Sequence, residues 1–182
     1  MNLPNILTLS RIAVIPFIVA LVMMNNFTAQ WIAFVLYVLA ALTDFLDGYL
    51  ARKMNIVSSL GRMLDPIADK LIVGALLITF AYEGSFSAAL TFAAVLIIMR
   101  EIAVSGLREH LGPLNIVIPV SGIAKYKTTL QLIALGLVMA EPIVPGLNLA
   151  ATASLWLATG LTLYTGYEYF AGAWPHLTKE DA

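Results

Sequence analysis

Four aspartates fall within one short stretch of the sequence, between Asp44 and Asp69. Asp44 and Asp47 are three residues apart, and Asp65 and Asp69 are four residues apart. On a helix, each of these spacings places both carboxylates on one face. Long apolar segments precede the first pair and follow the second pair. Both pairs are therefore expected at the ends of adjacent apolar helices.

Clustered carboxylates repel one another, so they need positive charge or protons nearby. On insertion scales, one carboxylate inside a bilayer already costs roughly 2.5–3.5 kcal/mol. Mg²⁺ prefers oxygen ligands, commonly one or two carboxylates together with substrate phosphates. Two aspartate pairs could hold two such ions about 3.5–4 Å apart, an arrangement that promotes phosphoryl displacement. The alternative is structural: the pairs would cap helices or form ion pairs with Arg52, Arg62 or Lys70.

Small residues accompany both aspartate pairs. Gly48 and Ala51 each lie four residues after an aspartate of the first pair, so the helix face beyond the carboxylates carries little side chain. A phosphate or nucleotide could lie against such a face. Close packing of helices is the other explanation, since membrane helices also favour small residues at their contacts. Gly61, one turn before Asp65, permits the same two interpretations.

The composition indicates a membrane protein. The chain has 182 residues, of which 60% are hydrophobic and 12% are charged. In a soluble domain, about a quarter of the residues are charged. The absence of cysteine excludes disulfides and thiolate chemistry. The absence of a basic run argues against nucleic-acid binding.

Apolar segments recur along the whole chain, and we interpret residues 1–182 as one all-α, polytopic membrane domain. Met1–Arg11 mixes apolar and polar residues and is predicted to form a short amphipathic helix in the membrane interface. Some segments are shorter than the ~20 residues that a span needs, so their helices must extend into the polar flanks. The third helix is expected to begin or to kink at Asp65–Pro66, because proline disfavours helix at the residue before it. The six predicted transmembrane helices are Ile12–Met24, Trp31–Asp47, Ile67–Tyr82, Phe86–Arg100, Thr128–Ala140 and Leu149–Tyr169.

The basic residues indicate the orientation in the membrane. With six spans, both termini share a side with the second and fourth joints. All ten Lys and Arg residues lie on that side or at helix ends facing it, whereas the opposite joints carry Glu83 and Glu141. Cytoplasmic loops are enriched in Lys and Arg. We therefore predict a multi-pass protein of a bacterial-type inner or cell membrane, with both termini and the aspartates on the cytoplasmic side.

The aspartates belong to a longer pattern, D-x2-D-G-x2-A-R-x8-G-x3-D-x3-D, which resembles the signature of the CDP-alcohol phosphatidyltransferases. Its positions here are Asp44, Asp47, Gly48, Ala51, Arg52, Gly61, Asp65 and Asp69. The resemblance implies transfer of a phosphatidyl group from a CDP-linked lipid to an alcohol, with release of CMP. It also implies that the four aspartates hold two Mg²⁺ or Mn²⁺ ions, that Asp69 is the catalytic base, and that the protein is a homodimer.

Two further segments resemble the phosphatidylglycerophosphate synthase branch of that family, whose acceptor is glycerol 3-phosphate. One is the opening N-I-L-T-L-S-R, and the other is R-E-I-x4-L-R-E followed by K-x-K-T, which begins after Ala124 where a glycine is expected. This resemblance implies that Arg100, Arg108 and Lys125 bind the acceptor phosphate. The residues implied in CDP-lipid binding are Asn5, Thr8, Gly48, Ala51, Arg52 and Gly61. The partners would be CDP-diacylglycerol, glycerol 3-phosphate and membrane lipids.

Other functions remain open at this stage. The same reaction could use inositol phosphate, serine or phosphatidylglycerol as acceptor. A cation or proton transporter would use buried aspartates, but it would want acidic residues at mid-membrane and on the far side as well. A lipid phosphatase would want a catalytic histidine, and His110 and His176 lie far from the aspartates in the sequence. A purely structural membrane protein leaves the aspartates unexplained.

Overall fold

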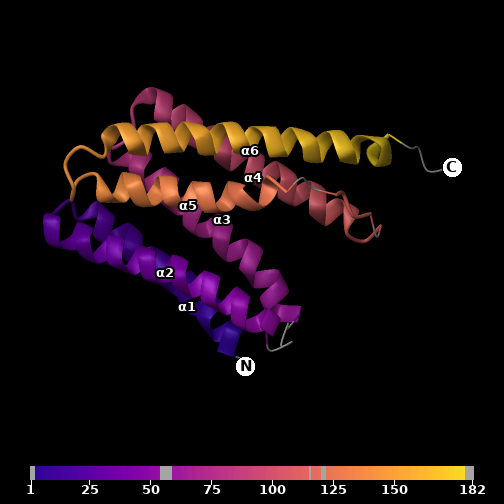
Figure 1. Cartoon of the computed structure of the whole chain (residues 1–182), viewed down its shortest axis with the longest axis horizontal. Helices are drawn as coiled ribbons and strands as arrows, with labels where there is room; N and C mark the ends of the chain where they lie inside the picture. Colours follow the sequence, from indigo (N-terminus) through magenta and orange to yellow (C-terminus); the bar gives the residue numbers. More distant parts are fainter. Residues whose placement is uncertain (1–2, 54–58, 115, 120–121, 179–182) are drawn as a thin grey trace.

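The computed structural model of the chain is a bundle of six helices (Figure 1). It describes residues 3–53, 59–114, 116–119 and 122–178, apart from the side chains of residues 3–4, 45–53, 59, 62 and 124–125. The helices are α1 (Leu3–Met23), α2 (Phe27–Lys53), α3 (Ser59–Tyr82), α4 (Ala88–Leu111), α5 (Ala124–Ala140) and α6 (Asn148–Leu177).

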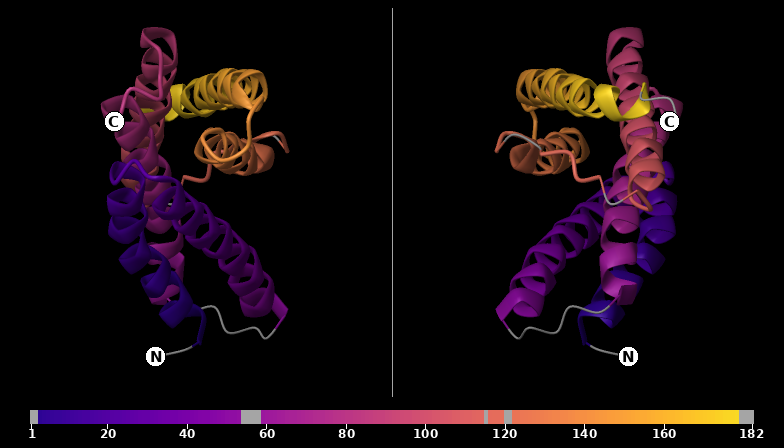
Figure 2. Two further views of the ribbon diagram at one scale, coloured as in Figure 1. Left: turned by 90° about the vertical axis from the view of Figure 1, so that its left-hand side faces the viewer. Right: turned by 90° about the vertical axis from the view of Figure 1, so that its right-hand side faces the viewer.

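The bundle has two halves. In the first, α1 packs against both α2 and α3, while α2 and α3 make no contact with each other within the described residues. In the second, α6 packs against both α4 and α5. The halves meet where α3 contacts α4 and α5, and where α2 contacts α5. Figure 2 shows α2 diverging from α3 while α5 and α6 run side by side.

Successive helices run in alternating directions between two ends of the bundle (Figure 1). At one end the joints are tight turns. Asn25 has a φ of 47°, and Gly84 and Gly146 have φ values of 77° and 94°, a conformation that glycine adopts without steric cost. The side chain of Asn26 caps α2 by accepting the backbone N–H of Ala29 at 2.9 Å. The first turns of α1, α3 and α5 and the last turns of α2, α4 and α6 lie at the other end.

Three of the described helices are long and apolar enough to cross a membrane, over Asn5–Met23, Phe27–Asp44 and Ala88–Leu111. The apolar part of α5, Tyr126–Ala140, is shorter. Large apolar side chains cover the outside of the bundle, with Phe17, Ile102 and Leu157 each about two-thirds exposed. A soluble monomer rarely exposes so much apolar surface, whereas lipid would cover it. The structure thus has the surface of a membrane protein.

Residues 3–11 do not form a separate helix. Instead, α1 runs unbroken from Leu3 to Met23, so the predicted interfacial helix is not confirmed. Asn5, Thr8 and Arg11 share one face of α1 and are buried, so these three polar side chains point into the protein rather than toward water. The third helix begins at Ser59, so Asp65–Pro66 lies inside it and not at its start.

Two apolar clusters form the core. The larger one includes Ile18, Leu76, Leu77 and Leu135, and it joins residues of all six helices. The smaller one packs α4 against α6 through residues such as Val104 and Tyr169. Along α4 and α6, polar residues including Arg100 and Thr162 lie between these two clusters.

Candidate active site

The polar face of α1 connects the two aspartate-bearing helices. The Thr8 hydroxyl donates a hydrogen bond to Oδ1 of Asp65 on α3, at 3.0 Å. One turn later, the Arg11 guanidinium forms an ion pair with Asp44 on α2. Its Nη1 is also 4.0 Å from Oδ1 of Asp69 on α3. Asp44, Asp65 and Asp69 are therefore gathered by a single turn of α1, although the described parts of α2 and α3 make no contact.

Exposure differs sharply within this cluster. The Arg11 side chain is 2% exposed, whereas the side chains of Asp44 and Asp69 are 34% and 37% exposed. The buried Arg11 guanidinium offsets part of the negative charge of the two carboxylates, and both carboxylates remain accessible to a ligand. Two carboxylates share the one guanidinium and Asp65 lies beside them, so the cluster retains net negative charge that favours further cations.

Asp69 also lines a small polar cavity between the two halves of the bundle, of ≈ 110 Å³. Three cationic residues line this cavity: Lys70 on α3, Arg108 on α4 and Lys127 on α5. The remaining lining residues are Pro66, Val73, Glu101, Thr128 and Gln131. The cavity thus brings a carboxylate of the aspartate motif beside a set of positive charges, which is the environment that a phosphate requires.

The structure separates the two arginines of α4. Arg108 lines the cavity, and its guanidinium lies 5.1 Å from the centroid of the Tyr169 ring on α6. Arg100 points away into the contact between α4 and α6, where its Nη2 donates to the Thr165 hydroxyl at 3.1 Å. Gly166 makes room for it, because a Cβ there would lie 2.8 Å from Cγ of Arg100. Arg100 is not among the residues that line the cavity.

Lys127 was not among the acceptor-binding residues predicted from the sequence. Its position near a helix end is also typical of a lysine whose side chain extends to the membrane surface. In the structure Lys127 is 8% exposed and forms an ion pair with Glu101 of α4. Its burial could have been inferred from Glu101, because an acidic residue within an apolar helix needs a partner.

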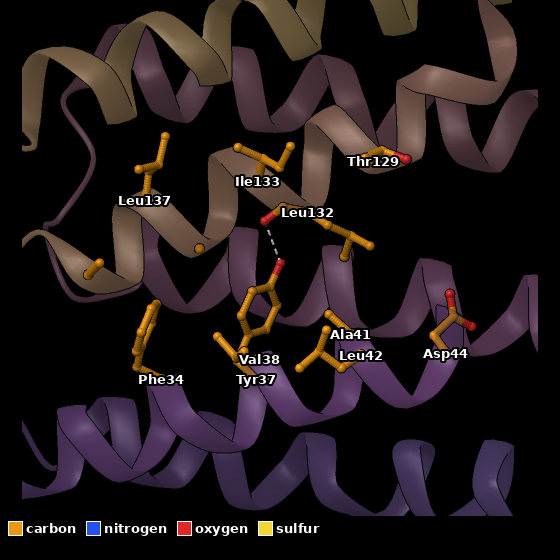
Figure 3. A pocket seen from close by; sticks show the side chains of 12 residues that line it. Phe34, Tyr37, Val38, Ala41, Leu42, Asp44, Thr129, Leu132, Ile133 and Leu137 are labelled. Carbon is orange, nitrogen blue, oxygen red and sulfur yellow. Dashed lines mark hydrogen bonds between the residues drawn. The ribbon is translucent and has the colours of Figure 1, made fainter. Parts of the chain in front are cut away.

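An apolar groove of ≈ 460 Å³ runs between α2 and α5 (Figure 3). Aromatic and aliphatic side chains line most of it, and Asp44 stands at one end. On its wall, the Tyr37 hydroxyl donates to the backbone carbonyl of Leu132 at 2.6 Å. The groove therefore leads from apolar surface to the aspartate cluster.

Comparison with known proteins assigns a family to this arrangement. The family model of the CDP-alcohol phosphatidyltransferases matches residues 1–164. The chain belongs to the CDP-alcohol phosphatidyltransferase family. It is 45% identical to a protein of Rickettsia typhi over 93% of this chain and 95% of that protein. It is 36% identical to a protein of Bacillus subtilis over 99% of each. Both relatives are named CDP-diacylglycerol–glycerol-3-phosphate 3-phosphatidyltransferase.

Members of this phosphatidyltransferase family generally depend on divalent metal ions. Within the described residues, no three acidic or histidine side chains lie close enough together to hold a metal. The Arg11 guanidinium lies within ion-pair distance of both Asp44 and Asp69. The chemistry of the donors nevertheless fits, because all of them are carboxylate oxygens, which hard divalent cations prefer.

Several predicted site residues of this phosphatidyltransferase lie outside the described side chains, namely Asp47, Gly48, Ala51, Arg52 and Lys125. The first four belong to the last turns of α2, and Lys125 belongs to the first turn of α5. Among the described candidates, Asn5 is buried on the same face of α1 as Thr8 and Arg11. Gly61 lies in the first turn of α3, one turn before Asp65.

Proposed function

We propose that this phosphatidyltransferase transfers the phosphatidyl group of CDP-diacylglycerol to sn-glycerol 3-phosphate, giving phosphatidylglycerol phosphate and CMP. The observation that carries the proposal is the place of Asp69, which belongs to the aspartate cluster and also lines the cationic cavity. One carboxylate can thus face both the diphosphate of the lipid and the hydroxyl of a phosphorylated acceptor. The names of relatives that are 36–45% identical over nearly the whole chain agree with this reaction.

The cavity supports a direct role for Asp69. The acceptor phosphate would bind Lys70, Arg108 and Lys127, with its terminal hydroxyl toward Asp69. Asp69 takes the hydroxyl proton as the oxygen attacks the phosphorus that carries the diacylglycerol. A new phosphorus–oxygen bond forms, the bond to the CMP oxygen breaks, and CMP leaves. In this proposal Lys70 and Lys127 take the place of Arg100, which points away from the cavity. The predicted contact of Lys125 stays a prediction, because its side chain lies outside the described residues.

Asp44, Asp47, Asp65 and Asp69 would hold two Mg²⁺ or Mn²⁺ ions. Bound there, such ions offset the charge of the diphosphate and of departing CMP. The CDP-lipid would contact the same region through the residues that the family resemblance implies: Asn5, Thr8, Gly48, Ala51, Arg52 and Gly61. The groove between α2 and α5 suits an acyl chain of this lipid, because it is apolar along its length and ends at Asp44.

In the membrane, we place all six helices as spans, with both termini and the reaction centre on the cytoplasmic side. The alternating helix directions and the charge asymmetry support this topology. The anionic, water-soluble acceptor would enter from that side, while the lipid substrate would enter laterally from the bilayer. A homodimer remains a prediction from the family resemblance.

The reaction can be tested with purified protein, CDP-diacylglycerol vesicles and a panel of acceptors. We expect CMP release with glycerol 3-phosphate and Mg²⁺ or Mn²⁺, little release with serine, inositol phosphate or phosphatidylglycerol, and loss of release in excess chelator. Faster release with another acceptor would disprove the assigned acceptor but keep the reaction class. No CMP release with any acceptor would refute the class itself.

A further inference from the structure

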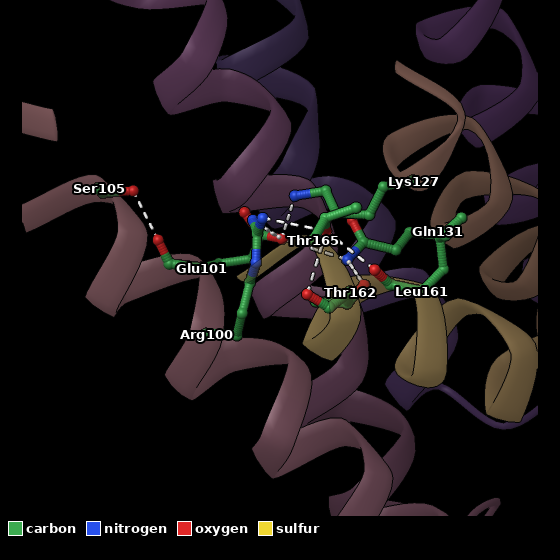
Figure 4. Close-up of polar contacts among 8 residues, drawn as sticks. All are labelled: Arg100, Glu101, Ser105, Lys127, Gln131, Leu161, Thr162 and Thr165. Atoms are coloured by element: carbon green, nitrogen blue, oxygen red, sulfur yellow. Dashed lines mark hydrogen bonds and ion pairs between the residues drawn. The ribbon is translucent and has the colours of Figure 1, made fainter. Parts of the chain in front are cut away.

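Glu101 lies at the centre of a buried polar network that joins α4, α5 and α6 (Figure 4). Three donors converge on its Oε1: the Lys127 ammonium, Nη1 of Arg100 at 3.2 Å and Nε2 of Gln131 at 3.3 Å. The side chains of Glu101 and Lys127 are 12% and 10% exposed. A single carboxylate oxygen therefore fixes the cation that lines the cavity.

Helix α6 holds this network from behind. Nε2 of Gln131 also donates to the Thr162 hydroxyl at 2.8 Å, and Arg100 donates to Thr165. Both threonines are almost completely buried. No described residue of α6 lines the cavity, yet α6 contacts two of the three donors to Glu101. The connection runs from Thr162 through Gln131 to Glu101 and then to Lys127.

Lys127 needs such support to act on a phosphate. A lysine ammonium is a point charge on a flexible stem, unlike the planar fork of arginine. Holding it in one place reduces the entropy lost when a ligand binds. One carboxylate shared between Lys127 and Arg100 also leaves the cluster with excess positive charge, which an anionic ligand would offset.

We propose that Glu101 is a positioning residue for the acceptor phosphate: it holds the Lys127 ammonium at the cavity wall, and Gln131 and Thr162 hold Glu101 in turn. This inference rests on the proposed function, because it concerns the phosphate of the same acceptor. It gives α6 a part in acceptor binding without any contact between α6 and the substrate.

The first test replaces Glu101 with glutamine, which keeps the shape and removes the charge. We expect the KM for glycerol 3-phosphate to rise about tenfold, as for loss of one well-placed charged contact. The kcat and the KM for CDP-diacylglycerol should stay within about twofold. The matched control is Glu109→Gln, an exposed position on the same helix with the same change in charge. If Glu101 only repelled the acceptor, E101Q would lower this KM, and that result would overturn the proposal.

E101Q leaves Arg100 and Lys127 without their carboxylate partner, and two uncompensated buried cations could prevent folding. A second test therefore keeps Glu101 and changes α6. Thr162→Val removes the hydroxyl that accepts from Gln131. Thr159→Val removes an equally buried hydroxyl of α6 that bonds its own helix, at the Leu155 carbonyl. We expect a three- to fivefold rise in the KM for glycerol 3-phosphate in T162V and none in T159V, since only Thr162 reaches Gln131. Equal values in the two variants would contradict the connection through α6.

A double-mutant cycle isolates the path through Lys127. Lys127→Met should raise the KM for glycerol 3-phosphate, and adding E101Q should then have little further effect. Full additivity would show that Glu101 acts by another route. If the wild-type protein releases CMP with glycerol 3-phosphate but the cycle is additive, only the positioning role fails. If the wild type does not use glycerol 3-phosphate, the proposed function fails first.

Discussion

The aspartate cluster of α1–α3 and the Glu101 cluster of α4–α6 both place ionised side chains between apolar helices, but they differ in exposure. The carboxylates of Asp44 and Asp69 are about one-third exposed beside the buried Arg11. In the second cluster, Glu101 and Lys127 are both nearly buried. The first cluster is therefore open to a ligand, whereas the second is closed by its own hydrogen bonds.

The sign of the excess charge also differs. Two carboxylates share one guanidinium in the first cluster, and two cations share one carboxylate in the second. The first cluster should attract cations and the second should attract anions. Asp69 lies where they meet, in a cavity that both halves of the bundle line. In the proposed function, the first half would therefore carry the reaction chemistry and the second half would recognise the acceptor.

Removal of the Asp69 carboxylate should have the largest effect. In Asp69→Asn we expect kcat to fall by about 10²–10⁴, the usual contribution of a general base. Binding of CDP-diacylglycerol should be retained, because the other aspartates remain. Turnover is measured as CMP release, and lipid binding as a shift in thermal midpoint. Glu141→Gln, at the opposite end of the bundle, is the control, and near-normal turnover in D69N would remove the base assignment.

Replacement of Arg11 tests whether the first cluster takes cations. Breaking a fully buried ion pair costs about 3–5 kcal/mol of stability, and breaking an exposed pair costs about 0–1 kcal/mol. Arg11 is buried but its aspartate partners are partly exposed, so Arg11→Met should fall between these limits, at about 2 kcal/mol. That corresponds to a fall of about 4–8 °C in thermal midpoint in chelator. Added Mg²⁺ should raise the midpoint more in R11M than in the wild type, because it would then supply the missing positive charge.

Arg11→Lys is the informative companion of this variant. It keeps the charge but loses the planar fork that can face Asp44 and Asp69 together. Its midpoint in chelator should fall between those of the wild type and R11M. If Mg²⁺ shifts all three proteins equally, the cluster does not exchange the arginine charge for a metal ion.

The sequence predicted the aspartate half of the molecule better than the other half. Asp65 and Asp69 are four residues apart on α3, so their shared helix face could be predicted from helix periodicity alone. The bridge through Arg11 could not, because Arg11 and Asp44 are 33 residues apart and no local rule pairs them. The unbroken α1 was missed for the same reason: burial of Asn5, Thr8 and Arg11 depends on helices that come later in the chain.

In the second half, the type and sequence position of a charged residue do not predict which way its side chain points. Arg100 and Lys127 are both cations near the ends of apolar segments, and only tertiary contacts separate their roles. Gly166 lets Arg100 turn toward α6, and Glu101 draws Lys127 to the cavity. The six-helix pattern itself was predictable from the apolar segments, whereas the sequence left open whether the third helix begins or kinks at Asp65–Pro66, and the structure begins it at Ser59.

The smallest effect is expected where the two halves touch through Tyr37. Its buried hydroxyl donates to the Leu132 carbonyl across the α2–α5 contact, so Tyr37→Phe should remove about 1 kcal/mol of stability. This predicts a thermal midpoint lower by about 2–4 °C. Tyr126→Phe is the control, because that tyrosine is 70% exposed on α5. Phenylalanine keeps the apolar ring on the wall of the groove, and the Tyr37 hydroxyl bonds only the Leu132 carbonyl among the described contacts, so CMP release well below the midpoint should be unchanged in both variants. A large loss of turnover in Y37F would mean that the α2–α5 contact sets the geometry of Asp44, and the two halves would then have to be treated as one site.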